Sequence, residues 1–263
     1  KVHKIGTLWN REMTRSVDGF HEMAMYDLPA MIDFVLQKTG QKQIYYIGYS
    51  QGSAIAFIAF SSMPELAQKI KMFFALAPVV TIKHAKSPIM KMSLLLDRQC
   101  KTLKKFLPEL CSHSFFHKSC ASMFFLLGGY NEKNLNMSRL DVYAAHYPDG
   151  TSVKNMIHWA QASPFDCWLA RLNDKCGFSG VPMSLQEKPP SYKIEEMPVP
   201  TAVWSGGEDW TADWRDVSLL VSRITNVVYY RNITDWNHWD FVWGLDAPEC
   251  LYSKIIDLME TPQ

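Results

Sequence analysis

Long apolar runs and an excess of charge are both missing from this sequence. No stretch of eighteen or more residues is continuously apolar, so the sequence predicts no transmembrane segment. The 27 basic residues nearly balance the 26 acidic ones, and the net charge of +1 argues against a nucleic-acid partner. A chain of 263 residues that is 48% hydrophobic can instead bury the core of one large α/β domain, or of a domain with an inserted subdomain.

Paired cysteines of the zinc-binding kind are missing as well. No Cys-x-x-Cys occurs, so the sequence predicts no metal site. The six cysteines leave two interpretations open, because they either close short loops or remain as buried thiols. Two pairs have a spacing of nine residues, which suits a short loop: Cys111 with Cys120, and Cys167 with Cys176. The other two cysteines are Cys100 and Cys250.

The motif around which the chain is organised is Gly48-Tyr49-Ser50-Gln51-Gly52. It reads Gly-x-Ser-x-Gly, with an aromatic and β-branched strand pattern before it and a small, apolar helical pattern after it. Such a turn between strand and helix is tight, so we expect a strained serine backbone and glycines that permit close backbone approach. This flanking pattern predicts a nucleophile elbow with Ser50 as the nucleophile.

The remaining patterns indicate an α/β fold with a mostly parallel sheet and an inserted helical segment. Strands are expected at residues 43–47, 71–80, 201–204 and 226–230, and helices at 27–38, 53–60, 216–223 and 247–259. In the first of these helices, Asp27 is the expected N-cap, Gly40 the expected stop, and Phe34 part of the buried side. We expect a hydrolase core at 1–82 and 197–263, interrupted by a helical cap at 83–196.

A serine hydroxyl needs a base to accept its proton and an acid to orient that base. In α/β-hydrolases these residues follow in the order serine, acid, histidine. His238 is the only histidine beyond the late strands, in the loop before the last helix, and is the predicted base. Asp209 follows a strand and the flexible Gly206-Gly207 pair, and is the predicted acid.

Three other carboxylates compete with Asp209. Asp213 has the position of a solvated loop charge, and Asp216 that of a helix N-cap. Asp235 is close to His238 in the sequence but lies on the wrong loop for the usual acid.

The oxyanion formed during attack needs two backbone N–H donors. One is expected from Gln51, directly after the nucleophile. The second usually comes from a loop marked by His-Gly, and no His-Gly occurs in this chain.

Several long stretches resemble the acid lipase family that includes gastric and lysosomal acid lipases. They include MYDLPAMIDFVLQKTGQKQ, IGYSQG, NLNMSRLDVY, GTSVKNMIHWAQA, VPTAVWSGGEDWTAD and HWDFVWGLDAPECLYSKIIDLM. The resemblance implies an α/β-hydrolase core with a helical cap, and Ser50, Asp209 and His238 as the catalytic triad. It further implies no cofactor, secretion or lysosomal delivery, and hydrolysis of triacylglycerols or cholesteryl esters at a lipid–water interface.

The chain departs from that family in four places. Tyr49 stands where the family usually has histidine, and the cap is shorter between Pro88 and Cys111. Cys120 matches one end of the family's cap disulfide, but Gly128 stands at the other. The first strands and their His-Gly loop have no match, so we expect a fragment of a longer lipase whose elbow strand exposes an apolar edge.

Competing functions follow from these features. The ordered triad and apolar cap favour a neutral lipid ester hydrolase, whereas the missing oxyanion loop favours a non-catalytic, lipid-binding hydrolase fold. A soluble esterase for short acyl chains is a third hypothesis. Two sequons, at Asn136 and Asn232, are candidate glycosylation sites of a secreted protein.

Overall fold

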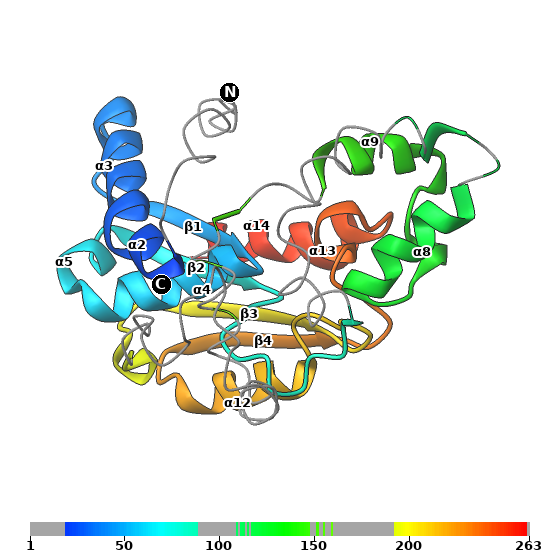
Figure 1. Ribbon diagram of the computed structural model, residues 1–263. Coiled ribbons are helices and arrows are strands. Elements are labelled where there is room, and N and C mark those ends of the chain that lie inside the picture. Colours follow the sequence, from blue (N-terminus) through cyan, green and yellow to red (C-terminus); the bar gives the residue numbers. More distant parts are fainter. Residues whose placement is uncertain are drawn as a thin grey trace, which may run out of the picture.

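The computed structural model describes residues 19–88, 117–147 and 192–261, together with positions 109, 111–113, 115, 151–152, 155 and 159. Figure 1 shows a central sheet with helices packed around it. A second group of helices, α8 (His117–Gly128) and α9 (Leu140–His146), lies beyond one end of the strands. Predictions for Cys100, Cys167, Cys176 and the shortened part of the cap fall outside the described residues.

The sheet has four strands in the order β1-β2-β3-β4, and every neighbouring pair is parallel. This arrangement confirms the predicted parallel sheet of an α/β fold. A parallel pair requires a crossover, and the described crossovers contain helices, as expected. The strands are β1 (Ile44–Tyr49), β2 (Ile70–Leu76), β3 (Thr201–Gly206) and β4 (Val227–Ile233).

Helices from both halves of the described chain pack around this sheet. α4 (Gln51–Ser62) packs on β1, and α12 (Trp214–Arg223) on β3 and β4. The other regular helices are α2 (Phe20–Glu22), α3 (Leu28–Thr39), α5 (Pro64–Ala67), α13 (Asp240–Trp243) and α14 (Ser253–Glu260). Short 3-10 or π turns are η3 (Met23–Asp27), η4 (Glu132–Asn134), η5 (Met137–Arg139), η8 (Ile194–Glu196) and η9 (Pro248–Tyr252).

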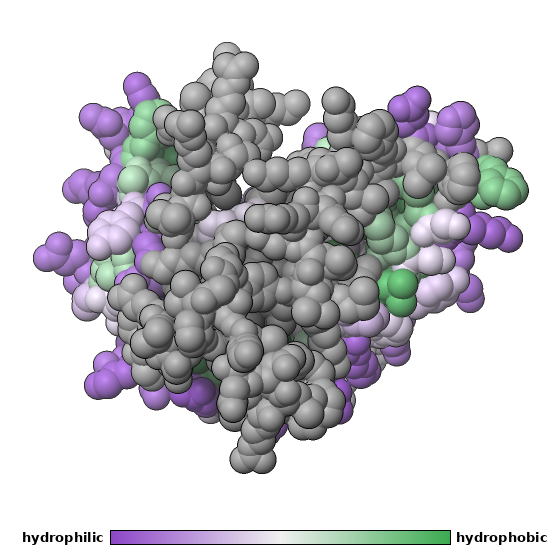
Figure 2. Space-filling model, viewed as in Figure 1, coloured by the Kyte–Doolittle hydropathy of each residue, from purple (hydrophilic) through white to green (hydrophobic). Residues whose placement is uncertain are grey.

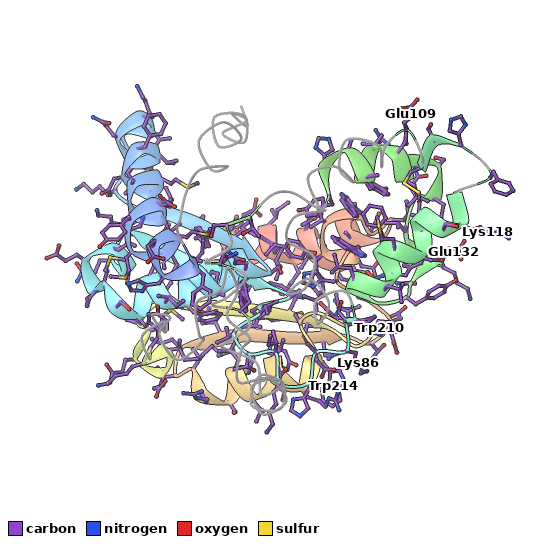
Figure 3. All side chains as sticks on the ribbon, in the orientation of Figure 1. Lys86, Glu109, Lys118, Glu132, Trp210 and Trp214 are labelled. Atoms are coloured by element: carbon purple, nitrogen blue, oxygen red, sulfur yellow. A yellow bond between two sulfur atoms is a disulfide. The ribbon has the colours of Figure 1, made fainter. Side chains whose placement is uncertain are left out.

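The buried apolar side chains form two separate clusters. The larger one fills the space between the sheet and its helices, and includes the fully buried Phe57, Phe73 and Trp204. The smaller one joins α8 and α9 around Phe124 and also contains Trp239, which comes from the last loop before α13. Figure 3 shows the exposed side chains Glu109, Lys118 and Glu132 on the outer side of these helices.

The first helix is longer than predicted. Asp27 has helical backbone angles (φ −71°, ψ −49°), and the helix continues upstream through η3 and α2, so the predicted N-cap at Asp27 is wrong. The extension buries Phe20, Met23 and Ala24, which an end at Asp27 would leave outside the core. Phe34 is 51% exposed rather than buried. Gly40 does end the helix, with φ +68°.

Two strands also differ from the expected pattern. β2 ends at Leu76 rather than near residue 80, because Ala77 has φ +43° and cannot continue an extended strand. β1 was predicted as a buried strand, yet Ile47 is 49% exposed. Among the described strands β1 has a neighbour on one side only, which agrees with the expected apolar edge.

Cys111 and Cys120 form a disulfide, with their Cα atoms 5.6 Å apart. Of the two open interpretations, the short closed loop is therefore correct for this pair, which lies in the smaller cluster. Cys250 is a free thiol. None of the helices in the described ranges is both long and apolar enough to cross a bilayer.

Candidate active site

Ser50 lies at the junction of β1 and α4 in a strained backbone conformation. Its φ of +55° with ψ −119° lies outside the regions that L-residues favour, as expected for a nucleophile elbow. The backbone N–H of Ser50 donates to the carbonyl of Leu76 at 2.9 Å, so the turn is fixed against β2. The elbow therefore holds the hydroxyl at the carboxyl end of the sheet and beside the N-terminus of α4.

The two glycines of the motif have different roles. A Cβ at Gly48 would lie 2.8 Å from the carbonyl oxygen of Gly52 and 2.9 Å from the backbone nitrogen of Ser53. A Cβ at Gly52 would meet only the hydroxyl oxygen of Tyr46, at 4.0 Å. Close backbone approach thus requires a glycine at position 48, whereas the same expectation for Gly52 is wrong.

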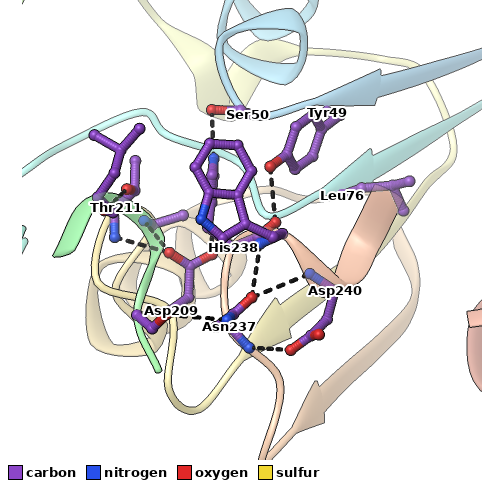
Figure 4. A network of polar contacts seen from close by, with 12 residues as sticks. Tyr49, Ser50, Leu76, Asp209, Thr211, Asn237, His238 and Asp240 are labelled. Carbon is purple, nitrogen blue, oxygen red and sulfur yellow. Dashed lines mark hydrogen bonds and ion pairs between the residues drawn. The ribbon is translucent and has the colours of Figure 1, made fainter. Parts of the chain in front are cut away.

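Three residues distant in the sequence meet in one chain of hydrogen bonds (Figure 4). Nε2 of His238 lies 2.9 Å from Oγ of Ser50, and Nδ1 of His238 lies 2.8 Å from Oδ2 of Asp209. His238 is 5% exposed and Asp209 1% exposed, so little water competes for these contacts. The structure brings together the three residues that the sequence selected as nucleophile, base and acid.

The second oxygen of Asp209 is occupied by its own loop. Oδ1 accepts the backbone N–H groups of Thr211 at 2.8 Å and Ala212 at 2.7 Å. These two bonds fix the carboxylate so that Oδ2 faces the imidazole. A base oriented in this way keeps Nε2 available for the serine proton.

None of the competing carboxylates contacts His238. Asp213 is fully buried rather than solvated; it caps α12 by accepting from the backbone nitrogen of Arg215 and forms an ion pair with that guanidinium at 2.8 Å. Burial acts to raise the pKa of Asp213, but the hydrogen bonds and charge of Arg215 outweigh it and leave the pKa below its usual value. Asp216 is not the predicted N-cap, because its oxygens accept from the backbone N–H and Nδ1 of His84. Asp235 is exposed.

The end of α8 connects the loop that carries Asp209 to residues 236–240, which we call the base loop because they include His238, the predicted base. The carbonyl of Gly128 accepts the backbone N–H of His238 at 2.9 Å and that of Trp210 at 3.2 Å. A Cβ at Gly128 would collide with the indole of Trp239, and Gly129 has φ +103°. Sequence reasoning missed this connection; the adjacent glycines were the only signal for it.

Asp240 links the base loop to the segment that follows α8 through the hydrogen bonds of its carboxylate. Its carboxylate accepts the backbone N–H of Asn237 at 2.6 Å and the side-chain amides of Asn131 at 2.8 Å and Asn134 at 3.1 Å. Burial raises the pKa of Asp240 to about 6 despite these donors, and the nearby Asp246 contributes to the rise. The carboxyl group therefore changes charge in a mildly acidic pH range.

Gln51, the predicted oxyanion donor, begins α4, where backbone N–H groups have no partner within the helix. Its side-chain oxygen accepts from Nδ2 of Asn155 at 3.0 Å and from Nε1 of Trp159 at 2.9 Å. Both partners belong to the predicted cap, so the cap contacts the elbow directly. The oxyanion role of Gln51 stays a prediction.

The arrangement suits acyl transfer by a serine nucleophile. A hydroxyl, an imidazole and a carboxylate stand in hydrogen-bonding order, and a helix N-terminus lies beside the hydroxyl. Within the part of the chain that the structure describes, no group of three His, Cys, Asp or Glu side chains could hold a metal ion.

Known sequences agree with this chemistry. A family described as alpha/beta hydrolase fold matches residues 7–245. The chain is 47% identical over 284 aligned residues to the lysosomal acid lipase/cholesteryl ester hydrolase of Homo sapiens, covering 98% of this chain and 70% of that protein. It is 47% identical to human lipase member M, covering 97% of this chain and 65% of that protein.

Solved structures of low sequence identity share the fold. A putative lipase from Acinetobacter baumannii matches with a TM-score of 0.50 and 16% identity, covering 90% of this chain and 68% of that one. A bromoperoxidase from Bacillus anthracis matches with a TM-score of 0.50 and 16% identity, covering 94% of this chain and 77% of that one. At such identities the likeness concerns the fold alone.

Substitution by alanine should affect stability differently at Gly48 and at Gly52. We expect Gly48→Ala to destabilise the fold by about 1 to 3 kcal/mol, because its methyl group overlaps backbone atoms of α4. Gly52→Ala should change stability by less than about 1 kcal/mol, since alanine favours a helix and meets no close atom. Urea unfolding of both variants tests this contrast, which equal destabilisation would contradict.

Asp240 should make stability depend on pH. Its folded-state pKa of about 6 lies above the unfolded value of about 4, so stability from this group falls as pH rises from about 4 to 6. Asp240→Asn removes that titration. The fall in the free energy of unfolding between about pH 4 and 6 should therefore be smaller by roughly 1 to 3 kcal/mol in this variant. Urea unfolding across this range measures it, with Asp257→Asn at an exposed position as the control. If the free energy of unfolding depends equally on pH in the wild type and in Asp240→Asn, the raised pKa of Asp240 is refuted.

Proposed function

The chain belongs to the alpha/beta hydrolase fold family and, within it, to the acid lipases, and from that premise we propose that it hydrolyses neutral lipid esters through an acyl-enzyme on Ser50. The observation that carries the proposal is the pair of contacts at 2.9 Å and 2.8 Å from His238 to Ser50 and Asp209. Asp209, His238 and Gln51 are proposed as acid, base and oxyanion donor.

In the acylation step, Oγ of Ser50 attacks the ester carbonyl carbon while its proton passes to Nε2 of His238. The carbonyl oxygen gains negative charge and accepts from the backbone N–H of Gln51. The intermediate collapses, the bond to the alcohol oxygen breaks, and His238 returns its proton to that oxygen. Water then attacks the acyl-enzyme by the same proton transfers, which releases the fatty acid and restores the serine.

The substrate class follows from the relatives. Human relatives are named lysosomal acid lipase/cholesteryl ester hydrolase and lipase, which supports triacylglycerols or cholesteryl esters as substrates. The chain spans about 70% of the length of the former and 65% of the latter. Figure 2 shows single hydrophobic residues among hydrophilic ones at the end of the molecule that holds α8 and α9, and Phe115 is 86% exposed. Contact with a lipid–water interface is proposed from the relatives' names and this exposed phenylalanine.

The proposed division of the chain places the hydrolase core at 1–82 and 197–263 and the cap at 83–196. Its support is that all four described strands lie outside the middle segment. Within that segment, α8 and α9 share an apolar cluster separate from that of the sheet, and of the core residues Trp239 joins it.

The proposed location is the lysosome or the exterior of the cell, because relatives carry the name lysosomal acid lipase. Either location implies passage through the secretory route, and glycosylation at Asn136 and Asn232 is proposed accordingly. Ser138 and Thr234, the hydroxyl residues of these sequons, are both exposed.

A second candidate is a hydrolase-fold protein that binds lipid without cleaving it. The edge position of β1 in the described sheet favours it, because the strand that carries the nucleophile is supported on one side only. The two candidates differ in the reactivity of Ser50.

A fluorophosphonate probe should label the wild-type chain at Ser50. The serine oxygen displaces fluoride from phosphorus, so labelling needs an activated nucleophile but no lipid substrate. We expect no label on Ser50→Ala and a rate at least about a thousandfold lower for His238→Ala. Ser61→Ala, on the same helix, should label at the wild-type rate.

Absence of label on the wild-type chain would favour the second candidate. Rates on emulsified long-chain and dissolved short-chain esters then separate a lipase from an esterase, and preference for the dissolved ester would contradict the proposed substrate class.

Glycosylation can be tested by expression through the secretory route. Asn136→Gln and Asn232→Gln should each increase electrophoretic mobility by one glycan, and peptide N-glycosidase should abolish the difference. Unchanged mobility of either variant would exclude that site.

A further inference from the structure

Tyr49 lies between the nucleophile and the base. It is the last residue of β1, directly before Ser50, and its hydroxyl donates to the backbone carbonyl of His238 at 2.7 Å. Its ring also lies against the imidazole, with centroids 4.9 Å apart and planes inclined by 33°. Figure 4 shows the phenol reaching to the His238 main chain and the Ser50 hydroxyl joined to the imidazole.

We propose that Tyr49 is a positioning residue that sets the distance between the Ser50 hydroxyl and the His238 imidazole; the inference rests on the proposed function, in which His238 deprotonates Ser50. Tyr49 is bonded covalently to the nucleophile and non-covalently to the base. Movement of the base loop away from the elbow therefore breaks the bond between Tyr49 and His238.

The phenol hydroxyl is suited to this position because it stays protonated. Burial raises the pKa of Tyr49 well above its ordinary value, and the neighbouring carboxylates of Asp209 and Asp240 raise it further. Tyr147 and Tyr252 act in the same direction. The hydroxyl is therefore a donor to the His238 carbonyl throughout the pH range in which an imidazole titrates.

The ring makes a second contribution. A cation near the face of an aromatic ring, within about 6 Å of its centroid, is attracted by the ring quadrupole. The imidazole becomes cationic when it takes the serine proton, so the ring of Tyr49 stabilises the state formed during attack. Phenylalanine would keep this contribution and lose the hydrogen bond.

The same strand offers a matched control. The hydroxyl of Tyr45 donates to the backbone carbonyl of Met259 at 2.8 Å, and thus fastens β1 to α14 rather than to the base loop. Tyr45→Phe and Tyr49→Phe therefore each delete one phenol-to-carbonyl bond of similar length from β1. Only the second deletion touches His238.

The rate of fluorophosphonate labelling at Ser50, measured as a function of pH, tests the proposal. We expect Tyr49→Phe to lower the labelling rate at the high-pH plateau about five- to tenfold. The midpoint, which is the pH at which the rate is half of its plateau, should not change. Tyr49→Leu should also move the midpoint about half a pH unit lower, because the imidazolium loses the ring. Tyr49→His, with a shorter side chain, should behave like Tyr49→Leu in plateau rate. Tyr45→Phe should match the wild type.

Hydrogen exchange gives a readout that does not depend on activity. Amide protons of the base loop, residues 236–240, should exchange at least about fivefold faster in Tyr49→Phe than in Tyr45→Phe. Equal labelling and equal exchange in these two variants would overturn the positioning role. A wild-type chain that fails to label would refute the proposed function, whereas the exchange comparison would still decide the role of Tyr49.

Discussion

His238 can contact Ser50 and Asp209 together because its main chain is held from two sides. The carbonyl of Gly128 accepts its N–H at 2.9 Å, and the hydroxyl of Tyr49 donates to its C=O at 2.7 Å. The loop that carries it is regular only over the short α13, and its own hydrogen bonds join Asn237 to Trp239 and Asp240 on either side of the His238 peptide groups. Removal of either partner leaves a buried polar group unpaired, which costs more than the bond itself contributes.

The helical segment beyond the strands is part of the site rather than an accessory to it. Trp239, next to His238, packs in the apolar cluster of α8 and α9, and its indole donates to the carbonyl of Phe124 at 2.8 Å. At the elbow, Asn155 and Trp159 both donate to the side-chain oxygen of Gln51. Residues from the predicted cap thus contact both the residue after His238 and the residue after Ser50.

Two features of the site are unfavourable in themselves, namely the strained backbone of Ser50 and the buried carboxyl group of Asp240. Ser50 keeps a φ of +55° because its N–H is tied to β2 and α4 follows at once. Asp240 is fully buried with three donors around it, and its pKa is raised to about 6. Each feature lowers stability locally and persists because the surrounding core holds it. Below a pH of about 6 the buried Asp240 is neutral, so its own destabilising contribution is removed.

The sequence by itself determined the parallel sheet, the elbow and the identity of the three polar residues. These features rest on local periodicity and on chain order, which neighbouring residues encode. The sequence misjudged Asp27, Phe34, Asp213 and Asp216, because the burial and hydrogen-bond partners of a side chain depend on distant segments. Only the tertiary structure decided how the base loop is held, since Gly128 and Tyr49 lie 110 and 189 residues from His238 and no local pattern links them.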